Sequence, residues 1–273
     1  MERIANEATM NVRCVRAGAL TGPAHARNVG WRAARGGIIA FTDDDCLPAP
    51  RWLRAGLAAM VTSGGVDGAY GRIVVPLPDD PTDYDRDAAG LERAEFATAN
   101  CFYARRALEE VDGFDERFTS AWREDSDVFL ALLERGRRLG FAHEALVVHP
   151  VRPAEWGVSI KQQRKSMFNA LLYKKHPALY RERVQASPPW VYYAIVGALL
   201  GAAIAAVFSL GWLFLVMLGA WALLTASFCA RRLRGTSRAP GHVAEMIVTS
   251  MLIPPLAVYW RLRGAVRFRV MFF

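Results

Sequence analysis

The apolar and polar positions divide the chain into a front part with short apolar runs and a back part with long ones. Runs of strand length, rich in β-branched and aromatic residues, occupy 36–42, 66–75, 96–103 and 141–148. Apolar residues at helical spacing occupy 51–61, 105–111 and 125–135. A Pro- and Asp-rich loop is predicted at 76–87, and the first 21 residues hold at most a helix end and a strand around 12–15. The pattern predicts an α/β domain over residues 1–160.

Residues 190–230 contain no charged side chain in 41 positions. Because one membrane-spanning helix needs about 20 apolar residues, this run is long enough for two. Ser209, Leu210 and Gly211 lie in its middle and form a natural turn. We therefore expect two antiparallel transmembrane helices, 190–208 and 212–230. A buried hairpin of a soluble protein is the alternative, but such a hairpin would carry a polar stripe.

The segments on either side of this apolar run are basic. Residues 161–189 are predicted to form a basic amphipathic linker, and a basic loop follows the run at 231. Residues 243–260 are a third apolar segment, which carries Glu245 and is interrupted by two prolines. A third span would place the arginines that follow it on the outside, against the positive-inside bias. We therefore expect a re-entrant or interfacial helix and a basic tail within 231–273.

The charge of the chain is unevenly distributed. The net charge is +8, from 34 Lys and Arg against 26 Asp and Glu, but residues 1–160 carry 19 basic and 24 acidic residues, whereas 161–273 carry 15 and 2. The basic flanks of the apolar run predict a multi-pass protein of a cell inner membrane with its front domain in the cytoplasm. Apolar residues between the C-terminal arginines favour a membrane surface over nucleic acid as partner. A composition that is 53% hydrophobic with four scattered cysteines excludes a disordered chain and a disulfide scaffold.

An acidic motif directly follows the first predicted strand. Asp43, Asp44 and Asp45 come after the apolar run at 36–42. Adjacent carboxylates repel one another unless a cation neutralises them, and hard divalent ions such as Mg²⁺ and Mn²⁺ prefer oxygen ligands. In open α/β sheets the carboxyl end of a strand is also where ligands bind. The motif indicates a metal or ligand site, although a solvated acidic turn would have the same sequence.

A second acidic group begins the predicted helix at 125–135. Glu124, Asp125 and Asp127 would stabilise the helix N-terminus through its dipole, so capping is one explanation for them. A general base held at the mouth of a metal site is the other. His149 ends the last predicted strand and is either a surface histidine or a metal ligand.

Four blocks of sequence together resemble a family 2 glycosyltransferase of the GT-A fold. They are GPAHARNVGWRAARGGIIAFTDDDCLP (22–48), FATANCFYARRALEEVDGFDERF (96–118), REDSDVFLALLERG (123–136) and FAHEALVVHP (141–150). The joint order of the blocks is more specific than any one of them, and the resemblance covers about half of the chain. It extends to membrane-linked bacterial members, in which a C-terminal helical hairpin follows the catalytic domain.

The resemblance implies an inverting, metal-dependent transfer of a sugar from a nucleotide-diphosphate sugar to the hydroxyl of a lipid or glycan acceptor, in envelope glycan or glycolipid synthesis. Asp43 and Asp45 match the DxD motif, with Asp43 near the ribose and metal, and Asp45 on the Mg²⁺ or Mn²⁺ that bridges the diphosphate. Asp44 lies between them and shares either role. His149 matches a position that sometimes completes the metal shell.

The same resemblance assigns the remaining candidate residues. Asp125 matches the general base that deprotonates the acceptor hydroxyl, and Glu124 matches the residue that orients this base or contacts the acceptor. Arg27 and Asn28 match a segment that lines the nucleotide pocket, where Arg27 could pair with phosphate.

The sequence departs from the family pattern in two places. The first strands of the nucleotide-binding half are not found, so we expect a partial GT-A sheet in an N-terminally truncated chain. The segment 161–165 also lacks the QxxRW motif of processive members, which indicates transfer of single sugars. A truncated, non-catalytic membrane scaffold or partner subunit is the main alternative. A nucleotidyltransferase shares the paired carboxylates but leaves 113–118 and 123–127 unexplained.

Overall fold

The computed structural model describes residues 12–18, 22–62 and 64–272. The chain divides into two compact units, which we treat separately. Unit 1 comprises Met1–Asp44, Pro48–Arg72 and Glu95–Val147, and unit 2 comprises Asp45–Leu47, Ile73–Ala94 and Val148–Phe273.

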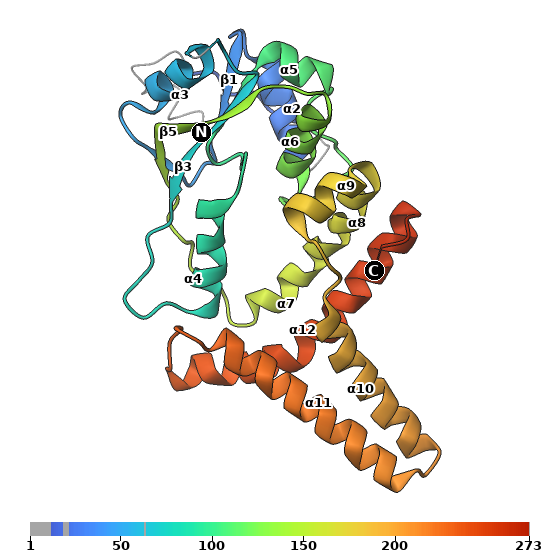
Figure 1. The fold of residues 1–273 in the computed structure, drawn as a ribbon. Helices are drawn as coiled ribbons and strands as arrows, with labels where there is room; N and C mark the ends of the chain where they lie inside the picture. The colour runs from blue at the N-terminus through green and yellow to red at the C-terminus, as the bar shows by residue number, and fades with distance from the viewer. Residues whose placement is uncertain (1–11, 19–21, 63, 273) are drawn as a thin grey trace. The chain divides into compact units, whose positions relative to one another are not determined.

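A five-stranded sheet forms the centre of the α/β part (Figure 1). Its strands are β1 (Ile38–Phe41), β2 (Leu47–Pro48), β3 (Gly68–Val74), β4 (Cys101–Ala104) and β5 (Leu139–Val148), in the order β1-β4-β3-β5-β2. Strand β4 is antiparallel to both β1 and β3. The four predicted strands are present, although the third begins at Cys101 and not at residue 96. The predicted α/β fold class, with apolar helices at the C-terminus, is confirmed.

Among the described residues of unit 1, four helices accompany the sheet. They are α2 (Pro23–Ala33), α3 (Trp52–Val61), α5 (Arg105–Glu110) and α6 (Glu124–Glu134), and the last three were predicted within one residue at each end. Helix α2 begins with a proline in its first turn, where the missing N–H costs nothing. The predicted strand around 12–15 is wrong, because residues 12–17 have no regular secondary structure. The predicted helix end before them lies outside the described residues.

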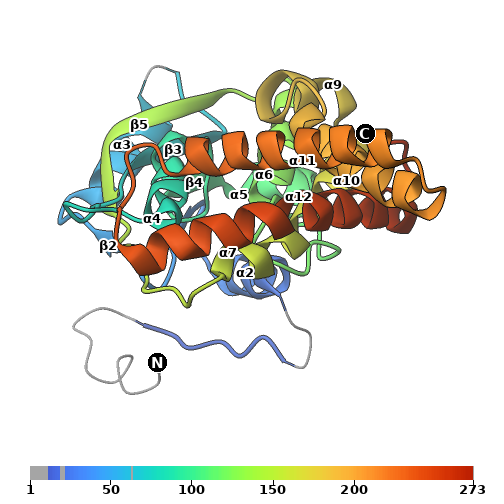
Figure 2. The ribbon, with the colours of Figure 1, turned by 90° about the horizontal axis from the view of Figure 1, so that it is seen from below.

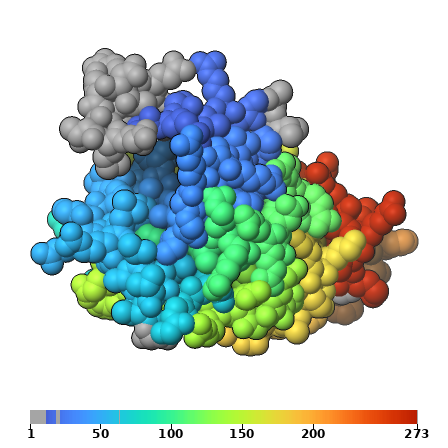
Figure 3. Space-filling model, turned by 90° about the horizontal axis from the view of Figure 1, so that it is seen from above, coloured from blue at the N-terminus to red at the C-terminus, as the bar shows by residue number. Residues whose placement is uncertain are grey.

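The guanidinium of Arg105 holds α2 against the start of α5. It donates to the carbonyl oxygens of Gly36 at 2.9 Å and Ala34 at 2.6 Å, just beyond the C-terminus of α2. Figure 3 shows the result on the surface, where the blue α2 segment lies beside the green residues that follow β4. This packing fixes one wall of the site described below.

Asn100 is the central polar residue of the sheet. Its side chain is fully buried, donates to the carbonyl oxygens of Arg72 (2.8 Å) and Ala145 (2.7 Å), and accepts from the indole N–H of Trp52 (2.8 Å). The amide therefore joins β3, β5 and α3 at one point. The close approach requires Gly71 in β3, because a Cβ there would lie 2.3 Å from the Ala145 carbonyl oxygen and 2.4 Å from the Asn100 amide.

The first helical elements of unit 2 lie where a loop is predicted. Helix α4 (Asp83–Ala88) continues into a 3₁₀ turn, Ala89–Arg93. Thr82 and Asp85 form a capping box, in which the Thr82 hydroxyl accepts from the Asp85 backbone N–H and the Asp85 carboxylate accepts from the Thr82 backbone N–H. The loop prediction for 76–87 is therefore wrong from Asp83 onward, because a Pro- and Asp-rich composition conceals this cap.

The predicted basic linker is largely helical. It contains α7 (Val158–Gln162), a 3₁₀ turn (Gln163–Met167), α8 (Phe168–Lys175), α9 (Pro177–Leu179) and a π-helical turn (Tyr180–Val184). Helix α7, the 3₁₀ turn and α8 pack on α12 (Pro240–Phe268). The contact is close, since a Cβ on Gly264 would lie 2.4 Å from the Met167 carbonyl oxygen.

In the part of the chain that the structure describes, three helices are long and apolar enough to cross a membrane: α10 (Trp190–Val207), α11 (Gly211–Arg232) and α12. Helices α10 and α11 form the predicted hairpin, and the turn between them contains Ser209 in the left-handed region. Small residues let the two helices approach, and a Cβ on Gly201 would lie 3.1 Å from the Met217 sulfur. Helix α12 contacts both members of the hairpin (Figure 2). It is continuous through Pro254 and Pro255, which the sequence analysis treats as a break.

Replacing Gly71 with alanine tests the packing around Asn100. The new methyl group has no room between the Ala145 carbonyl and the Asn100 amide, so we expect the free energy of unfolding to fall by about 1–3 kcal/mol. Gly30 in α2 is the matched control, because its Cβ would meet nothing within 4 Å and alanine there favours the helix by roughly 0.5–1 kcal/mol. Thermal unfolding in detergent should show a lower Tm for Gly71→Ala only, and equal Tm values for the two variants would contradict this account.

Candidate active site

A single arginine connects the two acidic motifs within unit 1. Arg27, on α2, donates from Nη1 to Glu124 Oε1 at 2.5 Å and from Nη2 to Asp43 Oδ1 at 3.3 Å. Only 17% of the Arg27 side chain is exposed, and its guanidinium lies 5.9 Å from the ring centroid of Phe114. Burial disfavours the charge, but Glu124 and Asp43 outweigh this and raise the pKa of Arg27. The end of β1 and the start of α6 therefore share one fixed positive charge.

Glu124 is the most buried carboxylate of this group, with 2% of the residue exposed. Burial, followed by the negative charge of Asp125, raises its pKa to about 7, although the ion pair with Arg27 acts in the opposite direction. Its Oε2 is buried without a hydrogen-bond partner among the described residues. An unsatisfied oxygen at this point can accept from a ligand or carry a proton.

Asp125 occupies the next position in the first turn of α6 and is partly exposed. Its Oδ1 accepts from the backbone N–H of Ser126 at 2.6 Å and from the Ser126 hydroxyl at 3.3 Å. Burial raises the pKa of Asp125, while the Ser126 hydrogen bond and Arg27 lower it less. Helix α6 begins abruptly at Arg123, whose φ of 77° is uncommon for a residue with a side chain. This turn directs two adjacent carboxylates into one site.

Asn28 is buried and all four of its hydrogen-bonding positions are occupied. Its amide donates to the Phe114 carbonyl (2.7 Å) and to Glu116 Oε1 (2.9 Å), and its oxygen accepts from the Phe114 N–H (2.9 Å) and the Trp31 indole (3.0 Å). Gly113 is needed beside it, because φ is +71° and a Cβ would lie 2.5 Å from the Asn28 oxygen. Asn28 thus positions the loop whose Phe114 lies beneath Arg27. Its predicted contact with a nucleotide stays a prediction.

Asp45, Cys46 and His149 form a group of potential metal ligands in unit 2. Their ligand atoms lie within 4.8 Å of one another, and His149 Nε2 is 3.5 Å from Asp45 Oδ1. The backbone N–H of His149 donates to the Val74 carbonyl at 2.8 Å, which fixes the histidine at the end of β5. The second oxygen of Asp45 pairs with Arg152 at 2.6 Å. The structure therefore brings together two of the predicted metal ligands, Asp45 and His149.

These side chains fit a divalent ion. Metal–ligand bonds of about 2.0–2.3 Å place two ligands of one ion roughly 3.3–4.5 Å apart, which agrees with the observed spacing. Asp43 lies two residues before Asp45, so chain connectivity keeps their Cα atoms within about 7 Å. Asp44, between them, is exposed in the turn after β1. Metal binding by Asp43 and nucleotide binding by Asp43 and Asp44 stay predictions.

Two residues near Asp45, Cys46 and Arg152, were not predicted from the sequence. Cys46 directly follows the acidic motif, so its position was visible, but a lone cysteine carries no signal without a neighbour in space. Arg152 follows β5 and meets Asp45 only in the folded chain.

A family profile described as "Glycosyl transferase family group 2" matches residues 38–261, which is most of the chain. The chain belongs to this glycosyltransferase family, as the sequence resemblance predicts.

The chain is similar to several known proteins, including the following two. Glycosyltransferase AglE of Haloferax volcanii is 29% identical over 147 residues, which are 50% of this chain and 47% of AglE. The chain therefore spans about half the length of the curated relative it matches. The solved structure of the mannosyltransferase PcManGT from Pyrobaculum calidifontis, in complex with GDP-Man and Mn²⁺, has 18% sequence identity and a TM-score of 0.44, covering 89% of this chain and 66% of that one.

The raised pKa of Glu124 makes stability depend on pH. A carboxyl group whose pKa is higher in the folded state than in the unfolded state stabilises the fold below the unfolded value near 4.5, and this contribution is lost as the pH rises to about 7. Glu124→Gln removes this loss while it keeps an acceptor for Arg27. We expect the Tm of Glu124→Gln minus that of the unmodified protein to increase between pH 4.5 and 7. The exposed Asp112→Asn is the control for the change from acid to amide, and a Tm difference for Glu124→Gln that does not increase with pH would disprove the assignment.

If the Cys46 thiol is a metal ligand, it should influence which divalent ions the site prefers. Thiolate and imidazole ligands favour Zn²⁺ and Co²⁺ over Mg²⁺ and Mn²⁺. Co²⁺ added to the protein should therefore give a thiolate charge-transfer absorption band, which Cys46→Ser removes and the exposed Cys14→Ser retains. An unchanged band in Cys46→Ser would exclude this thiol as a ligand.

Proposed function

We propose that the chain catalyses transfer of a sugar from a nucleotide-diphosphate sugar to an acceptor hydroxyl, with inversion at the anomeric carbon. The observation that carries the proposal is the bridge from Arg27 to both Asp43 and Glu124. The acidic motifs at 43–45 and 124–125 are far apart in sequence, and neither needs the other to form a turn or a helix cap. Their connection through a nearly buried arginine supports a common catalytic purpose, and family membership supports the reaction class.

In this mechanism Asp125 accepts the proton of the acceptor hydroxyl as that hydroxyl attacks the sugar. Its raised pKa, caused by burial, makes it a better base than an ordinary aspartate. Glu124 orients the base or the acceptor through its unsatisfied Oε2. Arg27 pairs with the carboxylates of Asp43 and Glu124 and offsets their charge, and Asn28 fixes the loop beneath it.

The leaving nucleoside diphosphate gains negative charge as the glycosidic bond breaks. A divalent ion held by Asp45 and His149, with Asp43 as a further predicted ligand, would offset that charge. Arg152 lies 2.6 Å from Asp45 and is 61% exposed, so it can turn from this carboxylate to the diphosphate.

We place the reaction at the cytoplasmic face of a cell inner membrane, with a lipid or glycan acceptor of envelope synthesis. The three long apolar helices and the basic residues at their ends support this location. The arginines in the last turns of α12 support an interfacial or re-entrant arrangement of this helix, because a full span would place them on the outer side of the membrane.

Asp125→Asn tests the base. The amide keeps the shape and an acceptor for Ser126 but cannot take a proton, so we expect the turnover rate to fall by about 10²–10⁴ while nucleotide-sugar binding is retained. The matched control is Asp112→Asn, which makes the same chemical change at an exposed residue of unit 1.

Transfer is measured with full-length protein in detergent and a panel of labelled nucleotide sugars. Full activity of Asp125→Asn would refute the base assignment. Absence of both sugar-nucleotide binding and transfer in the unmodified protein would favour the non-catalytic membrane scaffold.

A further inference from the structure

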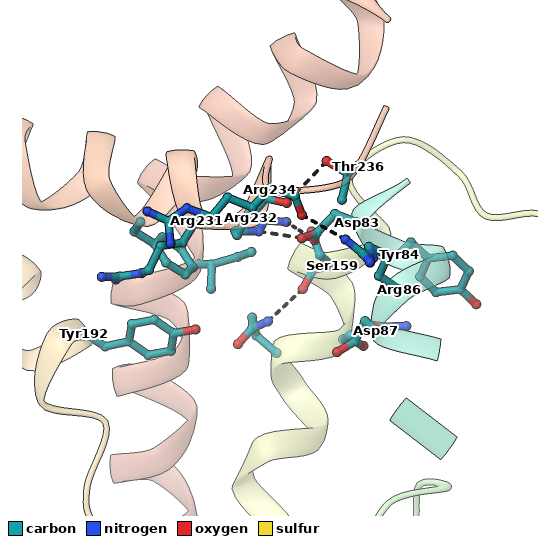
Figure 4. Close-up of a pocket in the computed structure, with 14 residues that line it drawn as sticks. Asp83, Tyr84, Arg86, Asp87, Ser159, Tyr192, Arg231, Arg232, Arg234 and Thr236 are labelled. Carbon is teal, nitrogen blue, oxygen red and sulfur yellow. Dashed lines mark hydrogen bonds and ion pairs between the residues drawn. The ribbon is translucent and has the colours of Figure 1, made fainter. Parts of the chain in front are cut away.

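Unit 2 contains a cavity of about 410 Å³ that belongs to none of the sites above (Figure 4). It lies where α4, α7 and the ends of α10 and α11 meet. Its lining has a charged part and an aromatic part. The charged part contains Asp83, Arg86, Asp87, Arg231, Arg232 and Arg234, and the aromatic part contains Tyr192 and Phe228.

Two of the four arginines that line the cavity are fixed by protein contacts. Arg232 pairs with Asp83 at 2.7 Å and donates to the hydroxyls of Thr249 (2.7 Å) and Ser250 (3.1 Å). Arg86 donates to the backbone carbonyls of Arg234 (3.0 Å) and Gly235 (2.9 Å), which holds the segment after α11 against α4. The backbone that carries the remaining two arginines is therefore anchored.

Arg231 and Arg234 also line the cavity, and they have no acidic partner among the residues that the structure describes (Figure 4). Four arginines against Asp83 and Asp87 leave the lining with an excess of two positive charges. Asp83 is neutralised by Arg232, and burial and the nearby Asp83 raise the pKa of Asp87, which weakens its opposition to an anion. The cavity is thus electrostatically suited to a negatively charged group.

The position of the cavity along the apolar helices restricts the source of that group. Arg231 and Arg234 come directly after the uncharged stretch that ends at Ala230, and Tyr192 lies in the first turn of α10. The rings of Tyr192 and Phe228 contact edge to face with centroids 5.4 Å apart, and together they form an apolar wall. If α10 and α11 cross the membrane, the arginines lie at the depth of the headgroups and the apolar wall faces the acyl chains.

We propose that this cavity binds the phosphate headgroup of an anionic membrane phospholipid, with Arg231 and Arg234 as its principal ligands. Guanidinium groups bind phosphate oxygens through paired, charge-assisted hydrogen bonds. The acyl chains continue along the exposed apolar surface of α10 and α11. The bound lipid ties α4 to the hairpin, so its effect is on the stability and placement of unit 2 and is independent of sugar transfer.

The test uses full-length protein in detergent, to which phosphatidylglycerol or phosphatidylcholine is added, and measures the Tm as a function of lipid concentration. We expect phosphatidylglycerol to raise the Tm with saturation and phosphatidylcholine to raise it little. The double variant Arg231→Gln/Arg234→Gln should need at least tenfold more phosphatidylglycerol for the same shift.

Arg238→Gln/Arg269→Gln is the matched control, because it removes the same two charges at exposed arginines that do not line the cavity. It should behave like the unmodified protein, and equal losses in the two double variants would overturn the proposal in favour of non-specific charge. Arg231→Lys/Arg234→Lys guards against a folding defect, since it should recover part of the lipid response. Recovery of none, with an unchanged Tm without lipid, would also contradict the proposal.

Glycerol 3-phosphate without acyl chains distinguishes a lipid from a soluble phosphate. A saturating Tm shift equal to that of phosphatidylglycerol would overturn the lipid assignment, whereas a much weaker shift supports it. Direct detection of one retained phosphatidylglycerol by native mass spectrometry, lost in Arg231→Gln/Arg234→Gln, gives an independent readout.

Discussion

The double ion pair of Arg27 is the interaction on which the candidate active site depends. It brings a carboxylate from the end of β1 and another from the start of α6 to one guanidinium, at 3.3 and 2.5 Å. The positive charge of Arg27 also opposes the rise that burial causes in the pKa of Glu124 and of Asp125. Arg27 thus permits the carboxylates to stay close, while burial, followed by the negative charge of Asp125, raises the pKa of Glu124 to about 7.

The neighbouring residue supports this arrangement from below. All hydrogen bonds of the Asn28 side chain are made with protein groups. They fix Phe114, whose ring lies beneath the guanidinium of Arg27. Two consecutive residues of α2 therefore have different tasks, one electrostatic and one architectural. A family motif that treats both as nucleotide contacts does not separate these tasks, whereas the hydrogen bonds do.

The back part of the chain follows a different physical rule. In the α/β unit, buried polar groups such as Asn100 pair with backbone carbonyls and specify the fold. In the helical unit, the arginines around the cavity lie at or near helix ends, where Arg232 holds Asp83 and Arg86 holds two carbonyls. The apolar lengths between them are free to meet lipid. The cavity lies where the charged helix ends of this unit meet the apolar parts of its helices. A ligand with a charged head and an apolar tail therefore fits it.

The sequence alone determined the class of this protein, because strand runs, helical spacing, an uncharged stretch and charge asymmetry are local properties of the chain. These predicted the α/β unit, the hairpin and both acidic motifs, but they missed α4, whose cap is hidden in a Pro- and Asp-rich segment, and they placed a strand at 12–15 that does not form. Only the tertiary structure decided which residues meet: Arg27 with Glu124, 97 positions away, and Arg152 with Asp45. Such contacts depend on how elements pack, and no local pattern encodes the distance between two side chains from different elements.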